Sequence, residues 1–295
     1  MNGAQRGFLL LGSQLGNPDR KPLSHAAMRQ LAQRIKSSEK PAENRDLELG
    51  DITALGYGEV MAKRILFLLG DDALLEHYLR RGSKAGCVAI TRICDTYPKV
   101  LRDKLGDEAP AVLWAKGNCD ILQMPMIALV GSRDISSGNR AFAAEVGIQA
   151  AKQGFALVSG NARGADKIAQ KACLENGGYV ISVVADELAG KNGTDHILYL
   201  NEEDFDVPFS AQRALSRNRV IHALADKTFV AQSSCGMGGT WDGSIKNLQH
   251  GWSPVFCFDD GSDAAVQLEQ FGAQCIAISQ LADMEKLTSA FRSFF

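Results

Sequence analysis

Short segments rich in glycine, serine and arginine carry the residues of this chain that are best suited to bind an anion. The first is Gly131-Ser132-Arg133, which directly follows an apolar run. Small residues before a helix let backbone N–H groups face a phosphate, and the guanidinium fork of Arg133 matches phosphate geometry. This segment therefore predicts an anion-binding turn between a strand and a helix.

A second segment of the same character is Ser159–Asp166. The residues in it that we predict to contact a ligand are Ser159, Gly160, Arg163, Gly164 and Asp166. Asp166 either caps the helix that follows or orients Arg163, and capping is the more common role of such an aspartate.

Further basic residues fall in a helix that we predict over residues 212–223. It contains Arg217-Asn218-Arg219, whose two arginines should point to different faces of the helix. Arg213, Arg217 and His222 have the spacing of a basic ridge along one face.

A glycine-rich segment, Gly236–Gly243, precedes a predicted helix that carries Lys246. We predict it to be a flexible turn, with Gly238, Gly239 and Thr240 next to the ligand. Taken together, the loops predict a phosphate-lined groove, and the spread of the arginines favours several phosphates rather than one.

The same loops exclude several other kinds of site. No Gly-x-Gly-x-x-Gly follows the first strand, and Ser159-Gly160 stands where a ribose-binding acid would end the second, which disfavours NAD and FAD. The five histidines are dispersed and the seven cysteines form no Cys-x-x-Cys, so no metal site or disulfide framework is indicated. Ser132 and Ser159 have no evident base nearby in sequence. We therefore expect no cofactor and no catalytic activity.

The elements that must position these loops alternate regularly from Met126 onward. Strands are predicted at 126–130, 155–158, 179–184, 228–231, 255–258 and 275–278, and helices at 139–153, 165–176, 212–223, 244–250 and 264–271. This alternation predicts an α/β fold with a Rossmann-like, doubly wound, mostly parallel sheet. Ligands of such sheets bind beyond the carboxyl ends of the strands, where the loops described above lie.

The first part of the chain has a different sequence pattern, without the regular alternation of strands and helices. One amphipathic helix is predicted over residues 21–35, and two or three short helices over 48–82 with a glycine turn at Leu55–Gly58. Short strands at 87–90 and 111–114 connect to the regular part. We therefore predict a small N-terminal helical domain, of the SAM or helix-hairpin-helix kind, at residues 1–85 and the Rossmann-like domain at residues 86–295.

Composition limits the class of protein. The chain has 295 residues, of which 45% are hydrophobic and 22% charged, with a net charge of −2, as in an ordinary folded protein. Because no apolar run approaches the length of a membrane span and the cysteines suit a reducing compartment, we expect a cytoplasmic protein without a membrane partner. A net charge near zero means that any anion site depends on a local cluster.

At these motifs the sequence resembles the DprA (Smf) family of DNA-processing proteins. The resemblance spans about residues 50–280 and rests on ordered segments: Asp95–Leu101, Leu113–Gly117, Gly131–Arg133, Ser159–Asp166 and Arg217–Ile221. It implies a Rossmann-like domain that binds single-stranded DNA, delivers it to the RecA recombinase during DNA uptake and transformation, and forms a homodimer. It also implies a binding pocket made by Arg133, Arg163, Arg217 and Arg219, with amides from Gly131, Ser132, Ser159 and Gly160.

Some positions depart from that family's pattern. They are Ser210 after Phe209, Gln170, Gln232, and Asp259–Gly261 in place of a Pro-Gly loop. Since the sequence stops at Phe295, soon after the last predicted strand, we expect a divergent member without the family's C-terminal winged helix.

Two alternatives remain open from sequence. Gly236–Asp242 is loosely similar to the catalytic loop of nucleotide phosphoribohydrolases of the Lonely Guy type, although only Asp242 could replace their glutamate. A Rossmann-like nucleotide sensor without catalysis is the other. A pocket closed around one nucleotide would favour these two, and an open groove with separated arginines would favour DNA.

Overall fold

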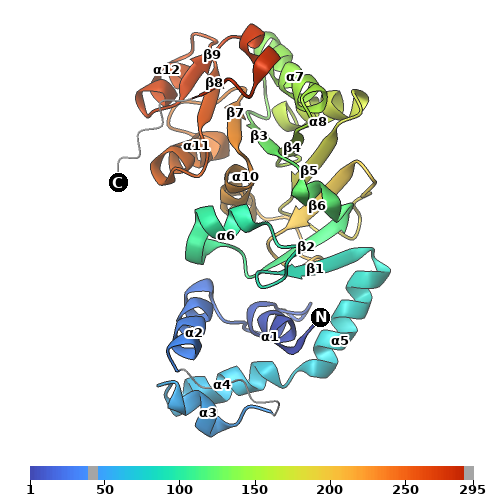
Figure 1. Cartoon of the computed structure of the whole chain (residues 1–295), viewed down its shortest axis with the longest axis vertical. Helices are drawn as coiled ribbons and strands as arrows, with labels where there is room; N and C mark the ends of the chain where they lie inside the picture. Colours follow the sequence, from blue (N-terminus) through green and yellow to red (C-terminus); the bar gives the residue numbers. More distant parts are fainter. Residues whose placement is uncertain (39–45, 289–295) are drawn as a thin grey trace.

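A nine-stranded sheet forms the centre of the computed structural model, which describes residues 1–38 and 46–288. The strand order is β1-β2-β6-β5-β4-β3-β7-β8-β9 (Figure 1). Strands β3 to β9 are parallel, and β1 and β2 pair antiparallel at one edge. The bounds are β1 Cys87–Thr91, β2 Val112–Gly117, β3 Met126–Val130, β4 Ala156–Ser159, β5 Tyr179–Val183, β6 Ile197–Asn201, β7 Lys227–Val230, β8 Val255–Phe258 and β9 Gln274–Ile276.

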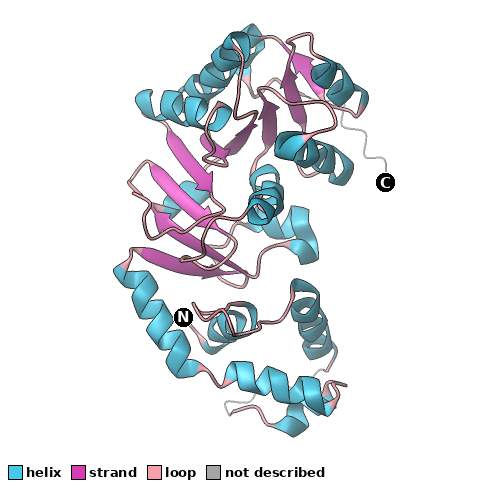
Figure 2. Ribbon diagram, turned by 180° about the vertical axis from the view of Figure 1, so that it is seen from behind, coloured by secondary structure: helices cyan, strands magenta, loops and turns pink. Residues whose placement is uncertain are grey.

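Helices cover both faces of this sheet, as Figure 2 also shows. On β3, Ile127 and Leu129 pack in the core under α7 (Ser137–Lys152) and α8 (Ala165–Glu175). Ala128 and Val130 face the opposite core, which includes α6 (Lys99–Leu105) and α10 (Asn218–Leu224). Because side chains alternate between the faces of a strand, an unbroken apolar run fits a strand buried on both sides. The predicted Rossmann-like, doubly wound sheet is confirmed.

The predicted elements differ from the observed ones at several places, and neither the helix at Gly3–Gly12 nor α6 was predicted. Strand β6 was not predicted. The helix expected over 212–223 is two helices, α9 (Ala211–Ser216) and α10, which meet at Arg217. Helix α11 spans Gly238–His250, so most of the expected flexible turn lies within the first two turns of this helix. Because glycine lowers helix propensity, the sequence pattern placed the start of α11 too late. The last helix, α12, spans Asp263–Gln270.

Five helices precede the sheet: α1 Gly3–Gly12, α2 His25–Ser37, α3 Leu49–Ala54, α4 Glu59–Leu69 and α5 Asp72–Lys84. The helix predicted at 21–35 begins later, because Ser24 caps it by accepting a hydrogen bond from the Ala27 amide. The α3–α4 pair confirms the predicted turn at Leu55–Gly58, where Gly56 has a positive φ of 84°. None of the helices within residues 1–38 and 46–288 is long and apolar enough to cross a bilayer.

The N-terminal helices share a core with the edge of the sheet. The rings of Tyr78, Trp114 and Phe205 pack together with centroid distances of 4.7–5.5 Å. The Ser13 hydroxyl donates to the Asp204 carboxylate at 2.6 Å. These contacts cross the predicted boundary between residues 85 and 86, so the division into two domains stays a prediction. Residues 39–45 and 289–295 of the two predicted ranges lie outside the described residues.

Candidate anion-binding site

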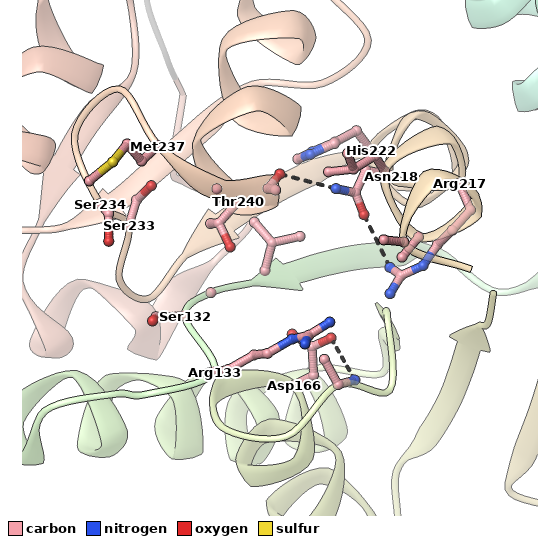
Figure 3. Close-up of a pocket in the computed structure, with 18 residues that line it drawn as sticks. Ser132, Arg133, Asp166, Arg217, Asn218, His222, Ser233, Ser234, Met237 and Thr240 are labelled. Carbon is pink, nitrogen blue, oxygen red and sulfur yellow. Dashed lines mark hydrogen bonds between the residues drawn. The ribbon is translucent and has the colours of Figure 1, made fainter. Parts of the chain in front are cut away.

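A cavity of about 430 Å³ lies at the point where the strand order reverses. Strand β3 has β4 on one side and β7 on the other, and in open α/β sheets the crevice beyond such a point is where ligands bind. The cavity opens between the loop after β3, the start of α8, the α9–α10 junction and the start of α11 (Figure 3).

Two glycines hold the first wall of the cavity together. A Cβ on Gly131 would lie 2.5 Å from the Cβ of Ala165, so only glycine fits there. Gly164 has a positive φ of 82° and lies against the Ser132 carbonyl, which accepts a hydrogen bond from the Ala165 amide at 3.2 Å. The loop after β3 is thereby fixed on the start of α8, and Arg133 extends from it into the cavity.

Arg217 enters from the opposite side and is only 8% exposed. Its Nη2 donates to the Gly160 carbonyl at 2.9 Å and its Nη1 to Asn218 Oδ1 at 3.2 Å. Its Nε is buried without a hydrogen-bond partner among the described residues. Burial lowers the pKa of Arg217, Asp166 opposes this, and the charge of Arg133 adds to it. An arginine keeps its charge under such conditions, so a buried cation with a free N–H borders the cavity.

Asp166 provides the negative charge nearest to this arginine. Its carboxylate accepts hydrogen bonds from the amides of Gly160 at 3.0 Å and Ala162 at 3.1 Å. Burial raises the pKa of Asp166, while Arg217 and these two amides oppose the rise. Both sequence-based roles of Asp166 are wrong: Gly164 is the N-cap of α8, and Arg163 pairs with Asp134 instead. Asp166 stabilises the loop after β4 through its hydrogen bonds with the amides of Gly160 and Ala162.

The third wall is the start of α11. Gly238–Thr240, the first residues of this helix, line the cavity. Met237 is the N-cap and makes no side-chain capping bond, so no capping side chain occupies the first amides of the helix. The hydroxyl of Ser233 is buried without a hydrogen-bond partner in the described part of the chain. Such a helix end favours a negative charge. Ser233, Ser234 and Met237 were not among the predicted site residues, although they lie in the loop after a predicted strand, as the other site residues do.

The structure brings together nine of the predicted site residues around this cavity: Gly131, Ser132, Arg133, Asp166, Arg217, Asn218, Gly238, Gly239 and Thr240. Their role as ligand contacts stays a prediction. The expected amide donors need correction, because the Ser132 amide donates to the Gln232 carbonyl at 3.0 Å and the Gly160 amide to Asp166. Ser159 is fully buried, and its hydroxyl accepts a bond from Gln170 at 2.6 Å.

Three predicted cations lie outside the cavity. Arg163 is exposed on the surface beside Asp134. Arg219 pairs with Glu202 at 2.6 Å, and Lys246 pairs with Asp242 at 2.9 Å. The last two cations line a neighbouring cavity of about 390 Å³, so Arg217 and Arg219 do point to different sides, as predicted.

The predicted basic ridge on residues 212–223 is wrong. His222 is buried, its Nδ1 lies 3.3 Å from the hydroxyl of Thr228, and burial, with a contribution from Arg217, lowers its pKa to about 3. The imidazole is therefore neutral at pH 7. Arg213 donates to the Pro208 carbonyl at 2.7 Å. The helix break at Arg217 removes the regular spacing on which the ridge depended.

The arrangement suits the binding of a phosphate group. It combines two arginines, free amides at a helix start and small hydroxyl side chains. Within residues 1–38 and 46–288, no group of three or more His, Cys, Asp or Glu side chains is placed to hold a metal. Asp242, the residue that would replace a phosphoribohydrolase glutamate, lines the neighbouring cavity, where it pairs with Lys246.

Known protein sequences resemble this chain over most of its length. The family model for DNA recombination-mediator protein A matches residues 89–284. DNA processing protein DprA of Streptococcus pneumoniae is 31% identical over 207 residues, which are 65% of this chain and 72% of that protein. DprA of Bacillus subtilis is 26% identical over 57% of this chain and 62% of its own length. The putative DprA of Mycobacterium tuberculosis is 28% identical, and the match spans 49% of it.

Solved structures agree with this similarity. The crystal structure of Streptococcus pneumoniae DprA superimposes with a TM-score of 0.69 and 26% identity, covering 90% of this chain and 99% of that one. DNA processing protein A of Helicobacter pylori, described for its single-stranded DNA binding mode, gives a TM-score of 0.56 at 22% identity, covering 68% of this chain and 95% of that one. The second likeness concerns the fold alone.

Proposed function

Because the chain belongs to the DNA recombination-mediator protein A family, which includes the DprA and Smf proteins, we propose that it binds single-stranded DNA at the cavity between β3 and β7. One observation carries this proposal: the charged Arg217 is buried at the cavity with an Nε–H that lacks a partner among the described residues. Leaving such a donor unsatisfied costs about 1–3 kcal/mol, and a phosphate oxygen would satisfy it.

The physics of such a site favours binding without sequence preference. Arginines and helix N-termini contact phosphates and do not read base edges. Arg133 and Arg217 face the cavity from different walls (Figure 3), which suits a backbone that passes between them. Affinity should fall steeply with salt, because each neutralised phosphate releases counterions.

We infer further that the chain delivers the bound strand to a RecA-type recombinase during DNA uptake and that it acts in the cytoplasm as a homodimer. The family's description as a recombination mediator supports the first part. All seven cysteines are free, which fits a reducing compartment. Val266 and Phe271, on and just after α12, are 49% and 54% exposed, and exposed apolar side chains near the edge strand β9 suit a self-contact.

Fluorescence anisotropy with a labelled single strand of mixed sequence tests the central proposal. We expect tight, salt-sensitive binding that a nucleoside monophosphate does not displace. The variants Arg133→Ala and Arg217→Ala should bind more weakly, while Arg140→Ala, an exposed arginine of α7 outside the cavity, serves as the control. Displacement by the monophosphate would instead favour a nucleotide enzyme or sensor.

The partner proposals need separate measurements. RecA filament assembly on protein-coated single strands should be faster with this chain than without it. Sedimentation should give a dimer, and Phe271→Ser should shift it toward the monomer. A monomeric wild-type protein, or unchanged assembly, would contradict these parts and leave DNA binding untouched.

A further inference from the structure

A second strongly basic cavity lies away from the site already described. Its volume is about 350 Å³, and it is formed by α1, α2, α6 and the segment after β1; α2 and α6 face each other across this region in Figure 1. Its charged lining residues are Arg29, Lys36, Arg92, Arg102 and Asp107. Four cations against one carboxylate make this lining more positive than that of the β3–β7 cavity, which holds Arg133, Arg217 and Asp166.

The cations of this basic cavity are only weakly compensated. Arg92 is partly buried, and its side chain makes no hydrogen bond or ion pair with the described residues. Arg102 donates to the backbone carbonyl of Arg92 at 3.2 Å, which leaves its charge unpaired. Arg29 and Asp107 are 3.6 Å apart, with side chains 42% and 53% exposed, and exposed pairs of this kind contribute little. The cavity therefore attracts an anion.

The basic cavity is connected to the proposed DNA site. The neighbouring cavity of about 390 Å³ shares Leu215 and Asn218 with the β3–β7 cavity and reaches Glu108 at its other end. The next residues along the chain on either side, Asp107 and Ala109, line the basic cavity. The cavity of about 390 Å³, called the middle cavity below, therefore borders the β3–β7 cavity at one end and the short turn at residues 107–109 at the other.

The surroundings of one buried tyrosine support this connection. Burial raises the pKa of Tyr97, while the charges of Arg92, Arg219 and Arg102 oppose the rise. Arg219 lines the middle cavity, and the other two line the basic one. All three arginines therefore lie within electrostatic reach of the same hydroxyl.

We propose that the basic cavity binds phosphates of the same single strand that occupies the β3–β7 cavity. This inference rests on the proposed function and extends it. The strand runs from Arg217 through the middle cavity to Arg92. The charges that line the middle cavity are balanced, with Arg219 and Lys246 against Glu108 and Asp242. The strand would therefore pass through the middle cavity, and the arginines of the β3–β7 cavity and the basic cavity would bind its phosphates.

Oligonucleotide length separates this inference from the proposed function. We would measure affinity by anisotropy for strands of about 6 and about 20 nucleotides, one near the lower end and one above the upper end of the site sizes common in single-strand binding proteins. The double variant Arg29→Ala/Arg92→Ala should weaken binding of the long strand about tenfold and leave the short one unchanged. Its salt slope on the long strand should fall by about 1.4, since each lost contact removes about 0.7.

Matched variants make the outcome decisive. Arg80→Ala removes an exposed arginine of α5 that lines neither cavity, and it should change neither affinity. Arg92→Lys should keep most of the long-strand affinity, because it keeps the charge. An equal loss on both strands, or no loss on the long one, would overturn the inference. A wild-type protein that binds neither strand would overturn the proposed function itself.

Discussion

The guanidinium group of Arg217 lies directly against Gly160, whose carbonyl oxygen accepts a hydrogen bond from Nη2 at 2.9 Å. A Cβ at position 160 would overlap this guanidinium. The glycine after β4 and the arginine between α9 and α10 therefore depend on one another. The Arg217 guanidinium can occupy this position only because residue 160 has no side chain.

The first prediction follows from this contact. Gly160→Ala should displace the Arg217 side chain and weaken binding of single-stranded DNA by about tenfold, equal to about 1.4 kcal/mol. Anisotropy titration of the purified variant measures this loss. Gly50→Ala is a suitable control for a glycine substitution, because a Cβ there has open space and the residue has no positive φ.

The combination Gly160→Ala/Arg217→Ala distinguishes this explanation from general damage. If the alanine at 160 acts only by moving Arg217, the double variant should bind no more weakly than Arg217→Ala alone. Additive losses would show that residue 160 has a different role.

The second prediction concerns salt. Arg133 and Arg217 each neutralise phosphate charge in the proposed complex, so Arg133→Ala should reduce the slope of log affinity against log salt by about 0.7. Titrations at several salt concentrations give this slope. A lower affinity with an unchanged slope would mean that Arg133 supports the loop without contacting phosphate.

Much of the fold could be predicted from sequence, since the parallel strands are continuous apolar runs separated by helical periods. The loops that follow β3 and β4 were found for the same reason: their glycines and arginines directly follow recognisable strands. Strand β6 was missed although its sequence, Ile-Leu-Tyr-Leu-Asn, is largely apolar, because a long segment without a helix separates it from β5 and interrupts the alternation of strands and helices.

The finer parts of the site depend on tertiary contacts that no local pattern encodes. Arg217 was predicted as part of a basic ridge along one helix face, and its burial results from packing against Gly160, a residue distant in the chain. The family resemblance placed Arg219 in the same pocket, but Arg219 pairs with Glu202, which directly follows the unpredicted strand β6. The glycine-rich start of α11 resembled a turn because helix propensity disfavours it, and packing overrides that preference.

The third prediction concerns the dependence of stability on pH. In the folded protein the pKa of His222 is about 3, whereas in the unfolded chain it should be about 6.5. Above pH 6.5 the residue is neutral in both states. As the pH falls below that value, only the unfolded chain takes up the proton, so the free energy of unfolding should fall by about 1.4 kcal/mol per pH unit. Urea unfolding of wild type and His222→Gln between pH 7 and about 5 measures the difference.

Asp204 should act in the opposite direction over part of this range. Burial raises its pKa from 3.8 to about 6, so the folded state takes up the proton first as the pH falls through this window, and this stabilises it. Asp204→Asn should therefore make the acid-side loss of stability steeper, and His222→Gln should make it shallower. Equal pH profiles for all three proteins would contradict both assignments.

The last prediction concerns the aromatic contact between the N-terminal helices and the sheet. Tyr78 of α5, Trp114 of β2 and Phe205 form one buried cluster. Phe205→Ala should lower the free energy of unfolding by about 3–5 kcal/mol, as expected for a buried phenylalanine, whereas Phe67→Ala, at an exposed ring of α4, should cost much less. Because the cluster belongs to both parts of the chain, helix content and tryptophan fluorescence should change together in urea. A separate early loss of helix, with tryptophan fluorescence unchanged, would show instead that residues 1–85 fold as an independent domain whose contact with the sheet contributes little to its stability.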